Sequence, residues 1–341
     1  MHMGHMLFAE AAREQAGLSQ VLFMPAHIQP FKQDKEVLPD DDRLRMLRLA
    51  TADNPHFGVT TIETDKDGVS YTIDSLRELR TQKEPSLLCF IIATDMFLNI
   101  EKWKESDVLL SEFAFAVGAR PGYDSEEAHR LAKKIKKTHG TRIEFIDNPK
   151  IELSSTEIRR RISEGSSIRY YVPEPVRRYL LVRYKVGGKR FEHTKRVMDL
   201  ADEMAGRFGV SRYKAALAAL LHDYCKDPKG GIENDIHHGG MAAEAAVREF
   251  NITDEDVLNA IRYHTTGRAG MSDLERVIFL ADTVEPGRTY NSISRLRETC
   301  LDDLYQGTHT VLVELRKYLL QKGLEVSKDT EAAIEEGRFG Q

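Results

Sequence analysis

The sequence predicts a two-domain protein, in which an α/β domain with a parallel sheet precedes an all-α domain. A chain of 341 residues is long for one domain. Short β-rich runs alternate with helical patterns in the first half, and these runs disappear from residue 188 onward. Gly187 and Gly188 mark a short linker near residues 183–188. We therefore expect domains at residues 1–184 and 185–341.

Five short runs in the first half are rich in β-branched and aromatic residues. They lie at residues 21–25, 57–63, 87–95, 113–120 and 142–147. Helical patterns separate them, for example at residues 41–50, 72–80 and 125–137. Strands that alternate with helices pair in parallel through right-handed crossovers. The first half should therefore form a parallel sheet covered by helices.

The second half consists of amphipathic helical patterns without β-rich runs. These patterns lie at residues 191–208, 211–225, 240–250, 253–264, 272–282 and 307–323. The polar segment 327–341 predicts a further helix with a frayed end. This pattern is typical of a helical domain.

Composition narrows the class of protein. Hydrophobic residues make up 41% of the chain and charged residues 30%, which is typical of globular domains. The net charge of -5 argues against a dedicated nucleic-acid-binding protein. No apolar stretch has membrane-spanning length, and no secretory leader opens the sequence. The three cysteines lack metal-site spacing, so we expect reduced thiols and a cytoplasmic location. The sequence leaves a homodimer open.

Histidines and aspartates follow the apolar faces of four helices in the second half. These groups are His193, His222, Asp223, His264 and Asp282. A buried imidazole or carboxylate is costly unless it is paired or binds a metal. Unrelated core histidines are the alternative, but one shared cation would satisfy all five groups. Nitrogen and oxygen ligands of this kind suit iron, manganese, cobalt or zinc.

The order of these groups resembles the HD superfamily of metal-dependent phosphohydrolases. The closer resemblance is to the bacterial HD-type hydrolases of symmetrical diadenosine tetraphosphate, and it covers residues 185–323. The matching segments are EHTKRV, LLHDYCKD, HHGG, AIRYHTTGRAGM and ADTVEPGR. The resemblance implies two transition-metal ions, iron first, or manganese or cobalt.

By this resemblance, one ion is held by His193, His222, Asp223 and Asp282. The second is held by His238 and His264, with Asp223 as the bridging ligand. His237 is the alternative ligand at this place. We prefer His238 because Gly239 follows it, as in the family.

The resemblance also implies a reaction. Water and diadenosine tetraphosphate give two ADP, with a metal-bound water as the nucleophile. Asp223 and Lys226 are the catalytic candidates in this half. Lys226, Arg262 and Arg288 would neutralise polyphosphate charge, and solvent-facing cations are the alternative reading for each.

Two motifs in the first half have the properties of a phosphate site. The segment His2-Met3-Gly4-His5 opens a helix predicted at residues 4–15, whose N-terminus favours anions. Residues 153–159 read as a Ser/Thr N-cap followed by an acidic third position and Arg159. A simple capping box is the alternative for the second motif.

Together these motifs resemble the HxGH-type nucleotidylyltransferases, specifically bacterial nicotinate-nucleotide adenylyltransferase, over residues 2–181. The resemblance implies a Rossmann-like sheet and the transfer of AMP from ATP to nicotinate mononucleotide in NAD biosynthesis, with Mg²⁺. The implied catalytic residues are His2 and His5. The implied substrate contacts are Ser155, Arg159 and Lys32 to phosphates, and Asp95 and Trp103 at the nicotinate end.

The first half departs from this family in three places. The family has a strand and a Gly-Gly-x-Phe-Asp-Pro loop before HxGH, whereas Met1 stands where that loop should end. Phe31 replaces a usual His, and Ala93 a usual Gly. We therefore expect a sheet without its first strand and an impaired transferase activity.

The sequence favours a fused bifunctional enzyme that acts on small nucleotides, without a nucleic-acid or membrane partner. One rival is a non-catalytic nucleotide-sensing first half that regulates the hydrolase. Another is an HD domain that acts on a different phosphoester, such as a nucleotide monophosphate or a cyclic dinucleotide.

Overall fold

The chain divides into two compact units, Met1–Arg177 and Arg178–Gln341. The computed structural model describes residues 1–28, 38–83, 87–120, 122–149, 151–227, 232–290 and 293–339, leaving aside the side chains of residues 83, 232–237 and 338–339. The division falls inside helix α8 (Glu174–Val186). The domain boundary at residues 184 and 185 stays a prediction. Gly187, with φ of 59°, separates α8 from α9 (Gly188–Phe208).

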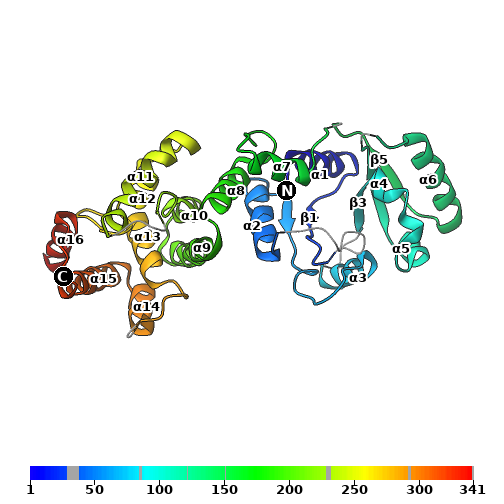
Figure 1. Cartoon of the computed structure of the whole chain (residues 1–341). Helices are drawn as coiled ribbons and strands as arrows, with labels where there is room; N and C mark the ends of the chain where they lie inside the picture. The colour runs from blue at the N-terminus through cyan, green and yellow to red at the C-terminus, as the bar shows by residue number, and fades with distance from the viewer. Residues whose placement is uncertain are drawn as a thin grey trace. The chain divides into compact units, whose positions relative to one another are not determined.

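The first unit alternates strands and helices, as the sequence predicts (Figure 1). Its elements are α1 (Met3–Gln15), β1 (Val21–Phe23), α2 (Asp40–Thr51), β2 (Phe57–Val59), α3 (Thr72–Lys83), β3 (Cys89–Ala93), α4 (Thr94–Phe97), the 3₁₀ helix η1 (Ile100–Lys102), α5 (Ser106–Glu112), β4 (Ala114–Gly118), α6 (Ser125–His139), β5 (Ile143–Ile146) and α7 (Ser155–Ser163). All pairings between these strands are parallel. The expected α/β class is therefore confirmed.

The strands belong to two separate sheets. One sheet pairs β1 with β2, and the other has the order β3-β4-β5. Helix α1 lies across both, because Ala9 packs with Val21 and Phe57 while Ala12 packs with Ala116. Side chains rather than strand pairing therefore hold the two sheets together among the described residues.

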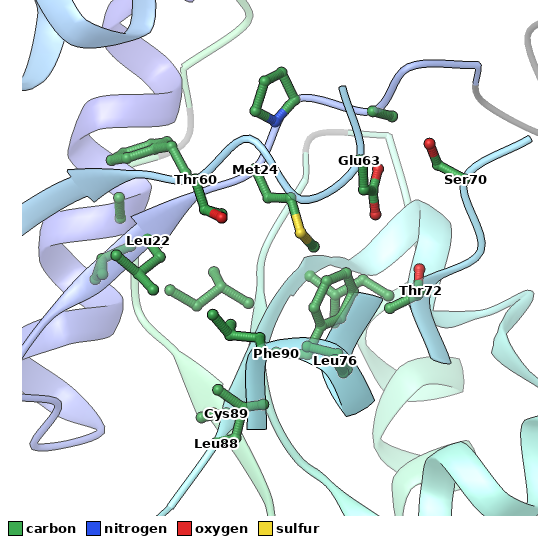
Figure 2. Close-up of a pocket in the computed structure, with 18 of the residues that line it drawn as sticks. Leu22, Met24, Thr60, Glu63, Ser70, Thr72, Leu76, Leu88, Cys89 and Phe90 are labelled. Carbon is green, nitrogen blue, oxygen red and sulfur yellow. The ribbon is translucent and has the colours of Figure 1, made fainter. Parts of the chain in front are cut away.

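A cavity of about 1290 Å³ lies between the facing strands β1 and β3. Leu22 and Met24 line it from the side of β1, and Phe90 lines it from β3 (Figure 2). Thr60 and Glu63 contribute polar groups to the lining. The cavity separates the β1-β2 sheet from the β3-β4-β5 sheet.

The second unit is helical throughout its described part. Its helices are α9 (Gly188–Phe208), α10 (Arg212–Leu221), α11 (Ile232–Phe250), α12 (Glu255–Arg262), α13 (Asp273–Val284), α14 (Ile293–Asp302), α15 (Leu304–Gln321) and α16 (Lys328–Phe339). Helix α13 is central, because its core residues Val277, Ile278 and Leu280 are fully buried. Burial of each such side chain contributes about 1.5–3 kcal/mol. No helix in the described ranges is long and apolar enough to cross a membrane.

Candidate metal centre and nucleotide site

His222 and Asp223 lie where α10 ends. Ala218 and Ala219 are small enough for close helix packing, and His222 is the C-cap residue of the helix. His222 Nδ1 donates a hydrogen bond to the carbonyl oxygen of Ala219, 2.6 Å away. Because a carbonyl only accepts, Nε2 of this neutral ring is left unprotonated. This buried Nε2 has no hydrogen-bond partner among the described residues. An orphaned buried lone pair of this kind fits a metal ligand.

Three further groups surround His222 Nε2. Asp223 Oδ2 lies 3.7 Å from it and Asp282 Oδ1 lies 3.9 Å from it. His193 Nε2, from α9, lies 2.9 Å from Asp282 Oδ1 and 3.9 Å from Asp223 Oδ2. The side chains of His193, His222 and Asp282 are close enough to share one ion. Two imidazole nitrogens and two carboxylate oxygens suit a transition metal.

A second set of groups surrounds the other oxygen of Asp223. His238 on α11 places Nε2 2.9 Å from Asp223 Oδ1, and His264 Nε2 lies 3.7 Å from the same oxygen. His264 follows α12, and its Nδ1 donates to the carbonyl oxygen of Ile261 at 2.7 Å. The Nε2 atoms of His238 and His264 are 3.0 Å apart. A cation between them would satisfy both nitrogens.

The two helices that carry this second set approach closely at Gly239. A Cβ on Gly239 would stand 2.5 Å from the backbone oxygen of Arg262. Only glycine therefore allows α11 to reach α12 at this point. The neighbouring Gly240 has open space around it, so the requirement is specific to the residue beside His238.

The electrostatics of this cluster favour the protonation states that metal ligands need at His222, Asp223 and Asp282. At His193 burial favours the neutral ring, but the hydrogen bond to Asp282 and the charge of that carboxylate raise its pKa. Burial lowers the pKa of His222 to about 4, so the ring is neutral at pH 7. Burial alone would raise the pKa of Asp282, but the hydrogen bond from His193 and nearby positive charges hold it well below its usual range. Burial likewise opposes ionisation of Asp223, whereas His222 and hydrogen bonds from His238 and His264 lower its pKa. Neutral imidazoles and ionised carboxylates bind metals.

Two of the three predicted cations lie at the cluster. Lys226 Nζ is 3.6 Å from Asp223 Oδ1, and Arg288 Nη2 is 3.0 Å from Asp282 Oδ1. Arg262 instead donates to Asn259 Oδ1 on its own helix, at 2.7 Å. The side chain of His237, the alternative to His238, lies outside the described residues.

Sequence reasoning missed a buried acid next to the centre. Glu285 is 2% exposed and accepts a hydrogen bond from His193 Nδ1 at 3.1 Å. Arg196 Nε also donates to this carboxylate. An acid at the C-terminal end of a helix opposes the helix dipole, and Glu285 is the C-cap of α13. An acidic residue at this unfavourable position was the feature of the sequence that could have indicated a role for Glu285.

The first unit brings the two predicted phosphate motifs together. His2 is the N-cap of α1, and its ring stacks on His5 with centroids 3.7 Å apart. A Cβ on Gly4 would lie 3.9 Å from Leu153 Cβ, just before α7 begins. Ser154 caps α7 by accepting from the backbone N–H of Glu157, so the predicted N-cap is confirmed. The N-termini of α1 and α7 therefore lie close together.

His2 is buried and its Nδ1 has no hydrogen-bond partner among the described residues. Burial, the N-terminal charge and Arg120 lower the pKa of His2 to about 4. A bound phosphate would favour the charged ring. Ser155 is exposed in the first turn of α7, and Arg159 donates to Thr156 Oγ1 at 3.3 Å.

Of the predicted nicotinate-end residues, Asp95 lies at the carboxyl end of β3, whereas the ring of Trp103 packs edge-to-face on Phe90 within that strand. Asp95 follows β3 and forms an ion pair with Arg120, which follows β4. Asp95 Oδ1 and Trp103 Nε1 are buried without hydrogen-bond partners among the described residues. Ligands bind at this edge in open parallel sheets. Lys32 and Phe31 lie outside the described residues.

Comparisons with known proteins match each unit separately. Residues 1–161 match the cytidylyltransferase-like family, and residues 190–287 match the HD domain family. A probable nicotinate-nucleotide adenylyltransferase of Thermoanaerobacter sp. (strain X514) is 39% identical over 181 residues, which are 53% of this chain and 86% of that protein. One from Moorella thermoacetica is 38% identical over 184 residues, 54% of this chain and 85% of that protein.

A solved structure also matches part of the chain. It is described as a predicted HD superfamily hydrolase involved in NAD metabolism from Clostridium acetobutylicum. It is 31% identical, with a TM-score of 0.46, and the match covers 48% of this chain and 96% of that one. The chain is thus a fusion, whose first half belongs to the nicotinate-nucleotide adenylyltransferase family and whose second half is an HD domain.

Proposed function

We propose that the HD half is a di-metal hydrolase that cleaves diadenosine tetraphosphate into two ADP. The observation that carries the di-metal proposal is the division of the Asp223 carboxylate. Its Oδ2 faces His193 and His222, whereas its Oδ1 faces His238 and His264. A carboxylate between two sets of imidazoles is suited to bridge two cations.

The residues of the chain have separable roles in this reaction. The ions that these histidines and aspartates would hold would supply positive charge to the phosphate oxygens and would lower the pKa of the attacking water. The backbone hydrogen bonds of His222 and His264 fix their rings with Nε2 toward Asp223. Lys226 and Arg288 offer positive charge beside the cluster, which polyphosphate oxygens require.

The substrate follows from the resemblance of residues 185–323 to the symmetrical hydrolases. The water oxygen joins one phosphorus of the central P–O–P bridge. The bridging oxygen leaves with the other phosphorus and accepts the proton that water loses. Both products are then ADP. We propose iron, manganese or cobalt as the metal.

Chromatography of the reaction products tests this proposal. The purified chain, loaded separately with Mn²⁺, Co²⁺ or Fe²⁺, is incubated with diadenosine tetraphosphate. ADP as the sole nucleotide product is expected. AMP together with ATP would mean asymmetric cleavage. Absence of turnover with all three metals would favour another phosphoester, such as a nucleotide monophosphate or a cyclic dinucleotide.

For the first half we propose adenylyl transfer from ATP to nicotinate mononucleotide, with Mg²⁺ and release of pyrophosphate. The support is family membership, the stacking of His2 on His5, and the close approach of Gly4 in α1 to Leu153, which directly precedes α7. Ser155 and Arg159 on α7 are the proposed phosphate contacts from that side. The substrate phosphate attacks the α-phosphorus directly, so positioning and charge neutralisation supply the catalysis. Asp95 and Trp103 would contact the nicotinate end.

The second candidate for the first half is a nucleotide sensor that binds without catalysis and regulates the HD half. The cavity between β1 and β3 favours it, because strand and loop backbone is needed there to complete a phosphate cradle. The cytoplasmic location and the homodimer remain predictions.

A further inference from the structure

The ring of His193 is held at both nitrogens by two carboxylates from one helix. Asp282 and Glu285 are three residues apart at the end of α13, so both face α9. Asp282 Oδ1 lies 2.9 Å from Nε2 and Glu285 Oε1 lies 3.1 Å from Nδ1. In the same cluster, His222 and His264 instead donate from Nδ1 to backbone carbonyls of their own turns. His193 therefore differs in depending on a side chain.

Glu285 is itself held in place from several directions. Arg196, one turn after His193 on α9, donates to Glu285 Oε2, and so does the backbone N–H of Gly287. Arg297 donates from Nη2 to the backbone oxygen of Glu285 at 3.0 Å. A Cβ at position 287 would stand 2.5 Å from Arg196 Nε, so glycine leaves room for this guanidinium.

We propose that Glu285 is a positioning residue for the metal centre, which fixes the tautomer and orientation of His193 so that Nε2 faces the first ion. This inference rests on the proposed metal-binding role of His193. A carboxylate behind a ligating imidazole also increases its basicity, and removal of such a partner typically weakens metal binding by about 10–100-fold. In Glu285→Gln the negative charge behind Nδ1 is lost, and the amide can present its oxygen or its NH2 group to that nitrogen, so the tautomer is no longer fixed. Arg196 also loses its carboxylate partner.

The structure provides a matched control on the same helix. Glu275 is also 2% exposed, and both of its oxygens accept hydrogen bonds from Arg268, at 2.7 Å each. It accepts a hydrogen bond from the backbone N–H of Ser272 in the capping box that begins α13, at the opposite end of the helix from Asp282. Glu275→Gln therefore removes a buried Glu–Arg ion pair of similar kind without changing the surroundings of His193.

The test compares Mn²⁺ affinity, by competition with a chelator, in wild type, Glu285→Gln and Glu275→Gln. We expect a loss of about 10–100-fold at one of two sites in Glu285→Gln only. The ligand-field spectrum of the Co²⁺-loaded protein should change in the same variant. Equal affinities in all three proteins would overturn the positioning role of Glu285 but leave the proposed di-metal function standing. A wild type that binds no metal would overturn the proposed di-metal function as well.

A measurement on the wild type covers the case in which Glu285→Gln does not fold. In the Zn²⁺-loaded protein, ¹⁵N NMR of the histidine rings should show His193 protonated at Nδ1, with slow exchange of that proton. His193 protonated at Nε2 would contradict the positioning role of Glu285.

Discussion

Asp223 Oδ1 lies 2.9 Å from His238 Nε2, although the two residues belong to different segments, one after α10 and one on α11. The other oxygen of Asp223 points to the opposite group of ligands, 3.7 Å from His222 Nε2. One carboxylate therefore links two sets of imidazoles, which would otherwise be independent sites. Loss of Asp223 should accordingly affect both sets, whereas loss of an outer histidine should affect one.

Metal content is the first prediction. The wild type should carry or take up two transition-metal ions per chain, His264→Ala should keep one, and Asp223→Ala should lose both. Elemental analysis after gel filtration measures this, with the exposed His56→Ala in the first unit as the control. If both His222→Ala and Asp223→Ala have the metal content of the wild type, the cluster is not the metal site.

The glycine beside His238 gives the second prediction. In Gly239→Ala the new Cβ meets backbone oxygens of Arg262 and Ile261, at 2.5 Å and 3.0 Å, so α11 must move away from α12. We expect about 1–3 kcal/mol lower free energy of unfolding. We also expect weaker metal binding at the His238 set, with the His193 set retained.

Gly240→Ala is the matched control for this variant, because a Cβ there meets no heavy atom within 4 Å. Denaturant unfolding and metal titration of both variants decide the outcome. If both alanines behave alike, the close approach at Gly239 does not position His238.

The third prediction concerns pH. The pKa of His222 is about 4 in the folded protein and near the ordinary histidine value of 6.5 when unfolded. The unfolded state therefore binds more protons between these values, and the metal-free protein loses stability as pH falls from 6.5 toward 4. For this one group the loss between pH 7 and pH 5 is about 2 kcal/mol.

Urea unfolding in the presence of a chelator, at pH 7 and pH 5, measures this effect. His222→Gln should show a smaller loss than wild type over the same interval. The raised pKa of His193 acts in the opposite direction but is present in both proteins, so their difference reports on His222. Equal pH dependence in the two proteins would mean that His222 does not titrate as its burial implies.

The fourth prediction concerns the cavity between β1 and β3. We expect weak adenylyl transfer by this chain, and higher activity when an apolar strand followed by Gly-Gly-Thr-Phe-Asp-Pro is added before Met1. The added strand would pair with both sheets, and the loop would supply backbone N–H groups to phosphate. Each such donor typically contributes on the order of 3 kcal/mol, or about 10²-fold in rate.

Pyrophosphate release from ATP and nicotinate mononucleotide measures the gain. An extension of equal length with glycine and serine in place of the apolar strand is the control. Full activity of the unextended chain would contradict the argument. An inactive extended chain, shown to be folded, would support the sensor function, and Phe31 and Ala93 would be the next residues to change.

The clustering of the candidate metal ligands could be predicted in part from the sequence because these residues lie in line with apolar helix faces. His193, His222 and His264 each continue such a face, and burial at that position leaves few uses for an imidazole besides a metal or an ion pair. Local periodicity places these groups inside the domain. The resemblance, not the periodicity, singled out His238, whose position depends on the approach of α11 to α12.

Long-range pairing was harder to predict. Glu285 lies close in sequence to Asp282, but its partners His193 and Arg196 are on another helix, and no local pattern links them. Arg262 was expected at the phosphates because it lies in a matching segment, and this role stays a prediction; its guanidinium donates to Asn259 on the same helix. The direction of a long side chain depends on tertiary neighbours, which spacing along one helix does not specify.

The separated sheets also bear on how this protein associates. Among the described residues, β1 pairs only with β2 and β3 only with β4, so each has one side without a strand. Such edges are templates for extended segments of other chains and promote aggregation. Apolar side chains such as Leu22 and Phe90 beside these edges strengthen that tendency. Solubility during synthesis should therefore depend on how quickly this part of the first unit is covered.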